Sequence, residues 1–329
     1  MSACCCPSAP STAHSCRFGV EVLPARGQHR LVDSVIAVQS LLKLRPDFVT
    51  VTYGAGGSTR GGTREFVSWI ARTGVPVYAH LTCQAQSLAD LDATIDELLA
   101  AGVTGVLALR GDVRDDGSRL VLPHADALVR RVRRRAEAAG LPVRVAVATF
   151  PAGHPDSRDL DEDALALRRK QDAGADFAIT QTFFAAGQYW RLVDKALAAG
   201  ATLPVVPGLM APVGVKRLDR LAGFAGTAAP AGLRSRLAEA DTDGRREIAA
   251  AWTTDLALEL LQGGAPGIQL FTLNEQTITG RVARAVRAYA SSRPGHPEQE
   301  NHAWEQRLRQ PDSRAASSSG IPVSGGIAN

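Results

Sequence analysis

Short apolar segments alternate with longer amphipathic segments along most of this chain of 329 residues. The short segments are rich in Val, Leu, Ile and Phe and are bounded by Gly, Pro or Asp, which is typical of buried strands. The longer segments carry apolar residues at helical spacing among Ala, Arg and Glu. Strands are expected at 18–24, 47–54, 75–83, 103–112, 143–150, 176–184, 203–209 and 267–274.

Helices are expected between consecutive strands. Examples are 88–101, for which Ser87 is a candidate N-cap, and 122–139, which ends at Gly140. Eight strand-and-helix units in about 275 residues indicate an α/β fold, a closed (β/α)8 TIM barrel, rather than an open doubly wound sheet. About 55 residues separate the seventh strand from the eighth, so an extra helix is expected in the seventh crossover.

The two ends of the chain lack this alternation. Residues 1–16 hold four of the five cysteines, and 291–329 are rich in Ser, Pro, Gly and Gln, so both are expected to be disordered tails. One catalytic barrel domain is expected at 17–290. Cys83 alone cannot form a disulfide inside that domain, which favours a reducing, cytoplasmic location. No signal peptide, long apolar run or strong net charge points to a membrane or a nucleic acid.

Polar residues stand at the carboxyl ends of most of the predicted strands. In a TIM barrel this is the edge at which active sites form, because closure brings all the strand ends around one mouth. A shared site is therefore expected to include Glu21, Thr52, Tyr53, His80, Thr82, Arg110, Asp112, Thr149, His154, Gln181 and Asn274.

Three charged residues, one at a strand end and two on a predicted helix, carry specific hypotheses. Glu21 lies in an otherwise apolar strand, where burial would raise its pKa and make it a proton donor; the alternative is an ion pair inside the barrel. Asp163 and Lys170 are seven residues apart on one helix face. They are either ordinary charges at the two helix ends or ligands for a ribose hydroxyl and a phosphate.

Common cofactor and metal motifs do not fit. The glycine-rich segment 54–59 follows a strand, but its third glycine position is Thr59 and no acidic residue ends the next strand, so it matches a dinucleotide fingerprint poorly. No Gly-Lys-Ser/Thr occurs, and no His or Cys spacing indicates a metal site. A segment that lets a ligand approach the backbone is the better interpretation of 54–59.

Eight segments resemble, in order, motifs of the methylenetetrahydrofolate reductase family. They are Val49-Thr-Val-Thr-Tyr-Gly54, His80-Leu-Thr-Cys83, Ala108-Leu-Arg-Gly-Asp112, Phe150-Pro-Ala-Gly-His-Pro155, Lys170-Gln-Asp-Ala-Gly-Ala-Asp176, Ala178-Ile-Thr-Gln181, Val206-Pro-Gly-Leu209 and Phe271-Thr-Leu-Asn274. The likeness extends from about Phe18 to about Val286, and the chain resembles a divergent, bacterial-type catalytic barrel of that family.

The resemblance implies a flavoprotein oxidoreductase of one-carbon metabolism and methionine biosynthesis, acting on CH-NH groups. FAD would be reduced by NADH or NADPH, and 5,10-methylenetetrahydrofolate would then be reduced to 5-methyltetrahydrofolate. A small-molecule folate is the expected partner, and no metal is needed. The resemblance does not decide between a monomer and a homo-oligomer. The alternatives are a divergent folate or pterin oxidoreductase of the same lineage with weak or no flavin binding, and a non-catalytic folate-binding homologue.

The resemblance also assigns roles by position. Catalysis would rest on Glu21 as the acid, on Asp112 near the flavin and pterin, and on Gln181 as a hydrogen-bond partner of the folate. Positions that resemble cofactor-binding ones are Thr52, Tyr53, His80, Arg110, Gly111, Asp112, His124, Ala125, Ala148, Phe150, His154, Asp163, Arg169 and Lys170. Substrate contacts are expected from Glu21, Gln181, Leu273 and Glu275. Glu275 replaces the Arg that commonly follows Thr-Leu-Asn, and this reversed charge would weaken folate binding.

Overall fold

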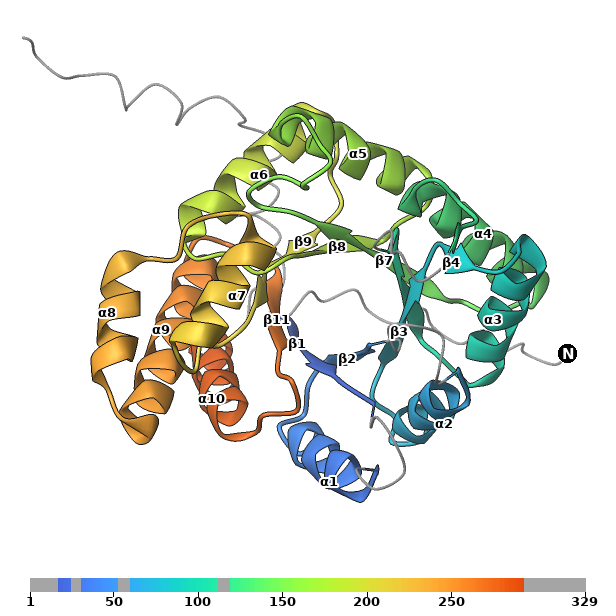
Figure 1. Cartoon of the computed structure of the whole chain (residues 1–329). Helices are drawn as coiled ribbons and strands as arrows, with labels where there is room; N and C mark the ends of the chain where they lie inside the picture. The colour runs from blue at the N-terminus through green and yellow to red at the C-terminus, as the bar shows by residue number, and fades with distance from the viewer. Residues whose placement is uncertain (1–16, 25–30, 53–59, 112–118, 293–329) are drawn as a thin grey trace, which may run out of the picture.

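The computed structural model describes residues 17–24, 31–52, 60–111 and 119–292. Its centre is a ring of parallel strands surrounded by helices (Figure 1). The strands of the ring are β1 Arg17–Val22, β2 Phe48–Val51, β3 Val77–Thr82, β5 Gly105–Leu109, β7 Arg144–Thr149, β8 Phe177–Thr180, β9 Val205–Val206, β10 Gly208–Leu209 and β11 Gly267–Phe271. They pair in the order β10-β11-β1-β2-β3-β5-β7-β8-β9.

Pro207 divides the seventh barrel strand into β9 and β10, because proline has no backbone N–H to donate to a ladder. β9 pairs with β8 and β10 pairs with β11, so the two ends of the sheet are parts of one strand. The carbonyl of Pro207 still accepts a hydrogen bond from the Gln269 N–H at 2.9 Å. All eight predicted strands are present, and the (β/α)8 TIM barrel is confirmed.

Helices cover the outside of the barrel. They are α1 Leu31–Leu42, α2 Arg60–Ala71, α3 Leu88–Ala100, α4 Ala125–Ala138, α5 Leu160–Asp172, α6 Ala186–Ala198, α7 Val215–Ala225, α8 Ala231–Glu239, α9 Thr242–Gln262 and α10 Thr277–Ser291. A small antiparallel sheet of β4 Gln84–Ala85 and β6 Arg119–Leu120 follows the ends of β3 and β5. The insertion predicted in the seventh crossover is confirmed and is larger than one helix, because α7, α8 and α9 all lie between β10 and β11.

Local capping explains where several helices begin and end. The Ser87 hydroxyl accepts the Asp90 N–H at 3.1 Å, as the sequence predicted for the start of α3. Asp159 caps α5 in the same way through the Glu162 N–H. Gly140, with a φ of 65°, follows the end of α4 in the left-handed region that glycine adopts readily.

Aromatic side chains fill the amino-terminal half of the barrel interior. Phe48, Tyr78 and Phe177 meet edge to face, with ring centroids 5.4 to 6.0 Å apart. Gly105 leaves room for them, because a Cβ there would lie 2.3 Å from the Tyr78 ring. This half of the barrel is therefore a packed core. Polar side chains lie at the other end of the barrel, where the carboxyl ends of the strands meet.

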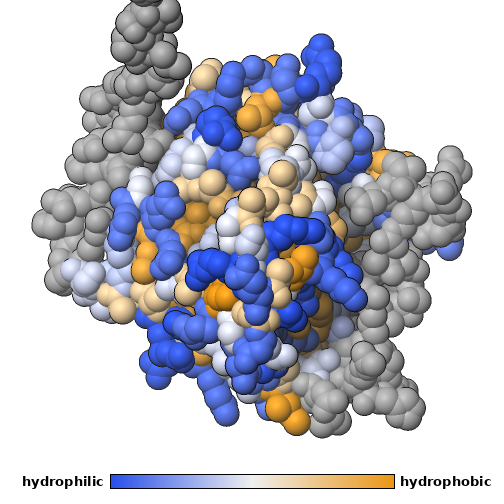
Figure 2. All heavy atoms as spheres, turned by 60° about the vertical axis from the view of Figure 1, so that its left-hand side comes forward, coloured by the Kyte–Doolittle hydropathy of each residue, from blue (hydrophilic) through white to orange (hydrophobic). Residues whose placement is uncertain are grey.

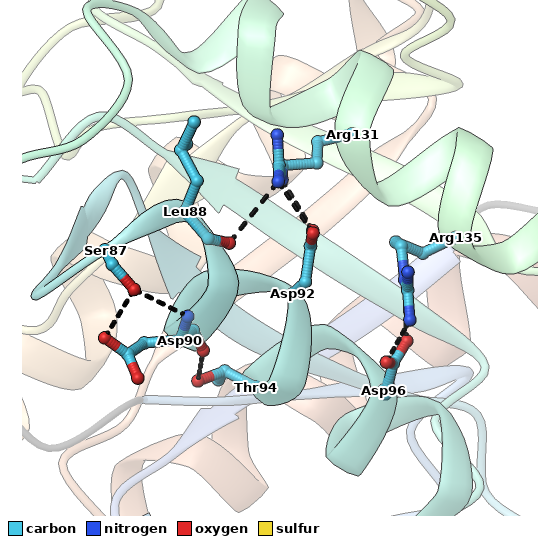
Figure 3. Close-up of polar contacts among 8 residues, drawn as sticks. All are labelled: Ser87, Leu88, Asp90, Asp92, Thr94, Asp96, Arg131 and Arg135. Carbon is cyan, nitrogen blue, oxygen red and sulfur yellow. Dashed lines mark hydrogen bonds and ion pairs between the residues drawn. The ribbon is translucent and has the colours of Figure 1, made fainter.

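Several arginines of α4 pair with neighbouring elements. Arg131 and Arg135 form ion pairs with Asp92 and Asp96, which join α4 to α3 (Figure 3). Arg133 joins the same helix to the start of β8 through Asp176. These acidic partners neutralise much of the basic charge on α4.

The side of the molecule that carries α7 to α10 is mainly hydrophilic, with apolar residues in small separate groups (Figure 2). Phe224 of α7 is one of the exposed apolar residues, at 52 % exposure. None of the described helices combines the length and apolar character needed to cross a bilayer.

Candidate active site at the carboxyl ends of the strands

Glu21 of β1 and His80 of β3 face each other near the carboxyl ends of their strands. Glu21 Oε2 lies 3.6 Å from His80 Nε2, and the two side chains are 14 % and 9 % exposed. This separation is too long for a hydrogen bond. Both groups are therefore held close together inside the barrel without a direct bond between them.

The environment favours the neutral form of each group. Burial raises the pKa of Glu21 to about 7, and the nearby Thr52 hydroxyl opposes this shift by a smaller amount. Burial also lowers the pKa of His80 to about 4. Near neutral pH the imidazole is therefore uncharged, and the carboxyl group still holds a proton in part of the molecules. Glu21 is therefore the group that can give up a proton, and because His80 is uncharged the two do not form an ion pair despite the short distance.

Three polar atoms at this edge are buried without a hydrogen-bond partner in the described structure. They are Thr52 Oγ1, His80 Nε2 and Arg110 Nε, from the ends of β2, β3 and β5. The Thr52 hydroxyl lies close enough to Glu21 to oppose the rise of its pKa, but the contact does not have the geometry of a hydrogen bond. A buried polar group without a partner costs free energy, and native proteins satisfy most such groups. Three of them along one edge indicate a surface that a polar ligand completes.

Asp163 of α5 holds the loop that follows β7. Its Oδ2 accepts the His154 N–H and its Oδ1 accepts the Ser157 hydroxyl, both at 2.7 Å. Lys170, two turns further along the same helix, donates from Nζ to the Ala148 carbonyl at 2.7 Å. Burial lowers the pKa of Lys170 to about 8, and the nearby Asp163 carboxylate opposes this. The two residues share one inner face of α5, and the contacts of Asp163 are with the protein itself.

Arg110 and Asp156 connect the ends of β5 and β7. Arg110 Nη2 lies 2.5 Å from Asp156 Oδ2, and the Asp156 N–H donates to His154 Nδ1 at 3.1 Å. The rings of Phe150 and His154 meet edge to face, with centroids 4.6 Å apart. Burial and then the Arg110 charge lower the pKa of His154. Sequence reasoning missed Asp156, because nothing in the loop sequence marked it as a partner of a residue 46 positions earlier.

Gln181 follows β8, and its backbone N–H donates to the Thr149 carbonyl at 2.8 Å. Its side-chain Oε1 accepts the Thr182 N–H, also at 2.8 Å. Since Phe177 and Ile179 of β8 point into the barrel, strand alternation turns Gln181 toward the same interior. The bond to Thr182 occupies the amide oxygen and leaves Nε2 as the donor available to a ligand.

The turn after β11 forms another part of the rim. Leu273 and Asn274 have φ values of 49° and 62°, in the left-handed region that non-glycine residues rarely adopt. Asn274 stabilises the turn by accepting the Leu23 N–H and donating to the Leu23 carbonyl, each at 2.9 Å. Leu273 is left 37 % exposed. Strained backbone of this kind is concentrated at functional sites.

Glu275 caps the amino terminus of α10. Its carboxylate oxygens accept the Thr277 and Ile278 N–H groups, each at 2.9 Å. An Arg at this position has no acceptor and would leave both N–H groups unsatisfied. The departure from the family pattern therefore has a structural reason that the sequence did not reveal.

The remaining predicted site residues have varied positions. Tyr53 and Asp112 lie outside the described residues. His124 is exposed at the N-cap of α4 without a side-chain capping bond, and the adjacent Ala125 is buried. Arg169 is exposed on α5. Within the described ranges, no group of three His, Cys, Asp or Glu side chains is arranged as metal ligands would be.

Gly111 is required by the protein's own structure at the end of β5. Its φ is 85°, and a Cβ there would lie 3.0 Å from Thr82 Cβ and 3.2 Å from the Gln84 side chain. A larger residue would be both strained and crowded. The glycine lets β5 end close against the small sheet of β4 and β6.

Comparison with known proteins agrees with this arrangement. The family model described as methylenetetrahydrofolate reductase matches residues 9–287. The 5,10-methylenetetrahydrofolate reductase of Escherichia coli strain K12 is 30 % identical over 260 residues, covering 76 % of this chain and 83 % of the relative. The protein of the same name from Pectobacterium carotovorum is 30 % identical over 253 residues, with the same coverage.

A plant relative and a solved structure extend the comparison. Methylenetetrahydrofolate reductase (NADH) 1 of Arabidopsis thaliana is 30 % identical over 275 residues, covering 78 % of this chain and 46 % of the relative. A dihydropteroate synthase structure from Xanthomonas albilineans superposes with a TM-score of 0.50 at 15 % identity, covering 86 % of this chain and 95 % of the other, which supports the fold alone. With a family model that spans most of its length and bacterial relatives that agree with it, the chain belongs to the methylenetetrahydrofolate reductase family.

Proposed function

We propose that the chain is a flavin-dependent methylenetetrahydrofolate reductase. It uses NADH or NADPH to reduce 5,10-methylenetetrahydrofolate to 5-methyltetrahydrofolate. The observation that carries this proposal is Glu21, a buried carboxyl group at the carboxyl edge of the barrel with its pKa raised to about 7. Family membership supports the substrate, and the NADH named for the plant relative supports NADH as one hydride donor to be tested.

The residues present fit an FAD molecule at the mouth. Thr52, His80 and Arg110 offer buried polar atoms that lack partners in the described structure. Lys170 offers a cation on the inner face of α5, suited to a phosphate, with Asp163 on the same face. When bound, FAD supplies the two-electron chemistry that links NAD(P)H oxidation to folate reduction.

Glu21 is the proton donor in this proposal. Opening the five-membered ring of the substrate leaves a nitrogen that must gain a proton, and a carboxyl group with a pKa near 7 holds one at neutral pH. His80 stays uncharged beside it, so no cation stabilises the carboxylate and lowers its pKa. Gln181 orients the substrate by donating from its free Nε2 group.

The test separates the two half-reactions of the purified protein. The first measures NADH or NADPH oxidation with a quinone as artificial acceptor, and the second measures oxidation with 5,10-methylenetetrahydrofolate. Glu21→Gln is expected to lower the folate-dependent rate at least about 100-fold and to leave the quinone-dependent rate within about twofold. A variant as active as the parent with folate removes Glu21 from the proton-donor role.

The visible spectrum distinguishes the proposal from its alternatives. Bound oxidised flavin absorbs near roughly 450 nm, whereas a protein without flavin is colourless. A colourless preparation that gains no absorbance and no activity on addition of FAD would favour the divergent oxidoreductase or the non-catalytic homologue. A yellow preparation without folate-dependent turnover would exclude the proposed reaction but retain the flavin.

A further inference from the structure

Gln269 and Thr50 form a polar contact inside the barrel, just below the carboxyl ends of the strands. Both side chains are fully buried, and Gln269 Nε2 donates to Thr50 Oγ1 at 2.9 Å. Gln269 belongs to β11 and Thr50 to β2, and β1 lies between these two strands (Figure 1). The Gln269 side chain therefore crosses the inner face of β1.

The strand register places this crossing directly beneath Glu21. Gln269 is the strand partner of Gly19, and Thr50 is the strand partner of Glu21. Gly19 and Glu21 face the same side of β1, because residues two apart in a strand share a face. A Cβ on Gly19 would lie 2.1 Å from Gln269 Oε1, so the missing side chain makes room for the amide. The amide of Gln269 thus occupies the space between Gly19 and Glu21.

The amide oxygen of Gln269 has no hydrogen-bond partner in the described structure. A buried carbonyl oxygen without a donor costs free energy. The layer around it is otherwise mainly apolar and includes Phe48 and Phe177. An apolar side chain at position 269 would avoid this cost, so stability alone does not account for the glutamine. Residues that break a local rule in this way are expected at functional sites.

Neutral groups surround the Glu21 carboxyl group. The inward-facing side chains of the two neighbouring strands and of β3 are Phe271 of β11, Thr50 and Thr52 of β2, and Tyr78 and His80 of β3. Burial raises the pKa of Tyr78 and lowers that of His80, so both are uncharged near neutral pH.

The side chains that face Glu21 from across the barrel are apolar and include Leu107, Leu109 and Ile179. Burial is the main cause of the raised pKa of Glu21, and no charged side chain of the described residues contributes to it. The dipoles of neutral neighbours therefore have a large influence on the protonation of this carboxyl group.

An amide oxygen favours one of the two protonation states of a carboxyl group beside it. The amide oxygen can only accept a hydrogen bond, and so can an ionised carboxylate, whereas a protonated carboxyl group has an O–H to donate. A fixed acceptor beneath Glu21 therefore disfavours the ionised form. The bond from Gln269 Nε2 to Thr50 fixes the amide with Oε1 toward β1.

We propose that Gln269 is a positioning residue for the acid of the active site: its amide, anchored by Thr50, holds an acceptor beneath Glu21 and keeps the carboxyl group in its proton-donating form. This inference deepens the proposed function and rests on it, because the proton is donated to the folate in that reaction. Gln269 acts through Glu21 and does not itself contact the folate or the flavin. The proposal gives the buried glutamine of β11 a role that an apolar residue could not fill.

The pH profile of the folate-dependent rate tests this role. Gln269→Met keeps the length of the side chain and removes the amide. The midpoint of the decrease at high pH should move down by about one pH unit. The rate should then fall about tenfold at pH 8 but no more than about twofold at pH 6, while quinone-dependent NAD(P)H oxidation keeps the parental profile.

Other outcomes of this experiment would overturn the inference. A purely structural role would lower the folate-dependent rate by the same factor at both pH values. An unchanged midpoint would show that the amide does not act on Glu21. A midpoint moved to higher pH would show that a donor, and not an acceptor, faces the carboxyl group.

Substitutions of Thr50 test the anchor of the amide. Thr50→Val keeps the shape of the side chain but removes the acceptor of Gln269 Nε2, so the midpoint should shift in the same direction. Thr50→Ser retains a hydroxyl and should recover most of the parental midpoint. Equal midpoints in the two variants would exclude the hydroxyl as the anchor.

Gln171→Met is the matched control for the substitution. Gln171 Oε1 accepts the Thr202 and Leu203 N–H groups at 2.6 and 2.8 Å, next to the amino-terminal end of β9. That is the end of the barrel opposite to Glu21. Gln171→Met should therefore lower stability without moving the midpoint of the pH profile, and an equal shift in this control would overturn the inference.

Unfolding measurements separate this inference from the proposed function. Urea unfolding at pH 5 and 8 measures how much Glu21→Gln gains in stability with pH, in the parent and in Gln269→Met. The gain should be smaller in Gln269→Met, because a folded-state pKa lower by one unit reduces the penalty of ionised Glu21 about tenfold at pH 8.

The two proposals can therefore fail independently. A parent without folate turnover, in which the gain still shrinks on Gln269→Met, would refute the proposed reaction and uphold the effect of Gln269 on Glu21. A parent with normal folate turnover and the same gain in both backgrounds would uphold the reaction and refute the role of Gln269.

Discussion

Glu21 and His80 lie 3.6 Å apart, and the barrel interior shifts their pKa values in opposite directions. Between about pH 4.5 and 7, folded Glu21 keeps a proton that the unfolded chain releases, so its contribution to the free energy of unfolding falls as pH rises. Between about pH 4 and 6.5, unfolded His80 holds a proton that the folded protein does not, so its contribution rises with pH. The two contributions largely cancel between pH 4.5 and 6.5.

Glu21→Gln should disturb this balance by removing the contribution that decreases with pH. Relative to the parent, the variant is expected to be more stable at pH 8 than at pH 5 by on the order of 2 kcal/mol, because only the parent must bury an ionised carboxylate at pH 8. Urea unfolding at the two pH values measures the difference. The same relative stability at both values would show that the pKa of Glu21 is not raised.

The folate-dependent rate should depend on the protonation of Glu21. If the protonated carboxyl group is the donor, the rate falls about tenfold per pH unit above about pH 7, because the pKa of Glu21 is raised to about 7. Quinone-dependent NAD(P)H oxidation should not share this decrease, since it needs no proton from Glu21. A pH profile that is flat from 6 to 9 for the folate reaction would contradict the assignment.

Glu275 should contribute to stability through α10. Glu275→Ala removes the acceptor of two backbone N–H groups and is expected to cost about 1–2 kcal/mol of unfolding free energy. Glu275→Arg, the residue common in the family, should cost at least as much, because its charge also opposes the helix terminus. Glu97→Ala, at an exposed position of α3, should change stability by less than about 0.5 kcal/mol. An unchanged thermal midpoint in Glu275→Ala would exclude the capping role.

Substitutions of Asp163 and Lys170 should have different effects, because Asp163 has a structural role and Lys170 a ligand-binding role. Asp163→Ala leaves the His154 N–H and the Ser157 hydroxyl without their acceptor and should destabilise the flavin-free protein by about 2–3 kcal/mol. Asp161→Ala, on the exposed side of the same helix, should cost less than about 1 kcal/mol.

Lys170→Ala should weaken FAD retention about tenfold while leaving the flavin-free protein close to parental stability, since it removes a buried cation that bonds a single carbonyl. Gel filtration followed by the visible spectrum measures retention. Full retention in Lys170→Ala would assign the side chain to packing of α5 alone.

Sequence patterns predicted the parts of the fold that local chemistry specifies. Continuous apolar runs occur where strands are buried on both faces, and capping residues such as Ser87 occur where helix N–H groups need an acceptor. Strand lengths were overestimated, as for 176–184 against Phe177–Thr180, because flanking residues continue an extended pattern after the ladder ends. The seventh strand was predicted whole, whereas Pro207 divides it.

The candidate site residues also divide into those that the local sequence marks and those that it does not. Glu21 stood out as a candidate because a carboxylate in an apolar strand is conspicuous, and Gln181 because it ends a strand. Asp156 and Gln269 did not, because one looks like an ordinary charged residue of a loop and the other like a polar residue within a strand. Their significance depends on neighbours distant in sequence, such as Arg110 for Asp156 and Thr50 for Gln269.

The sequence by itself determined the order of strands and helices and the barrel they form, because hydrophobic periodicity and capping act over a few residues at a time. Only the tertiary structure decided which polar groups lack partners, how burial moves the pKa values of Glu21 and His80, and that Glu275 caps a helix while Gln269 crosses β1 beneath Glu21. Desolvation and charge pairing depend on what surrounds an atom in space, and that is set only when distant segments pack together.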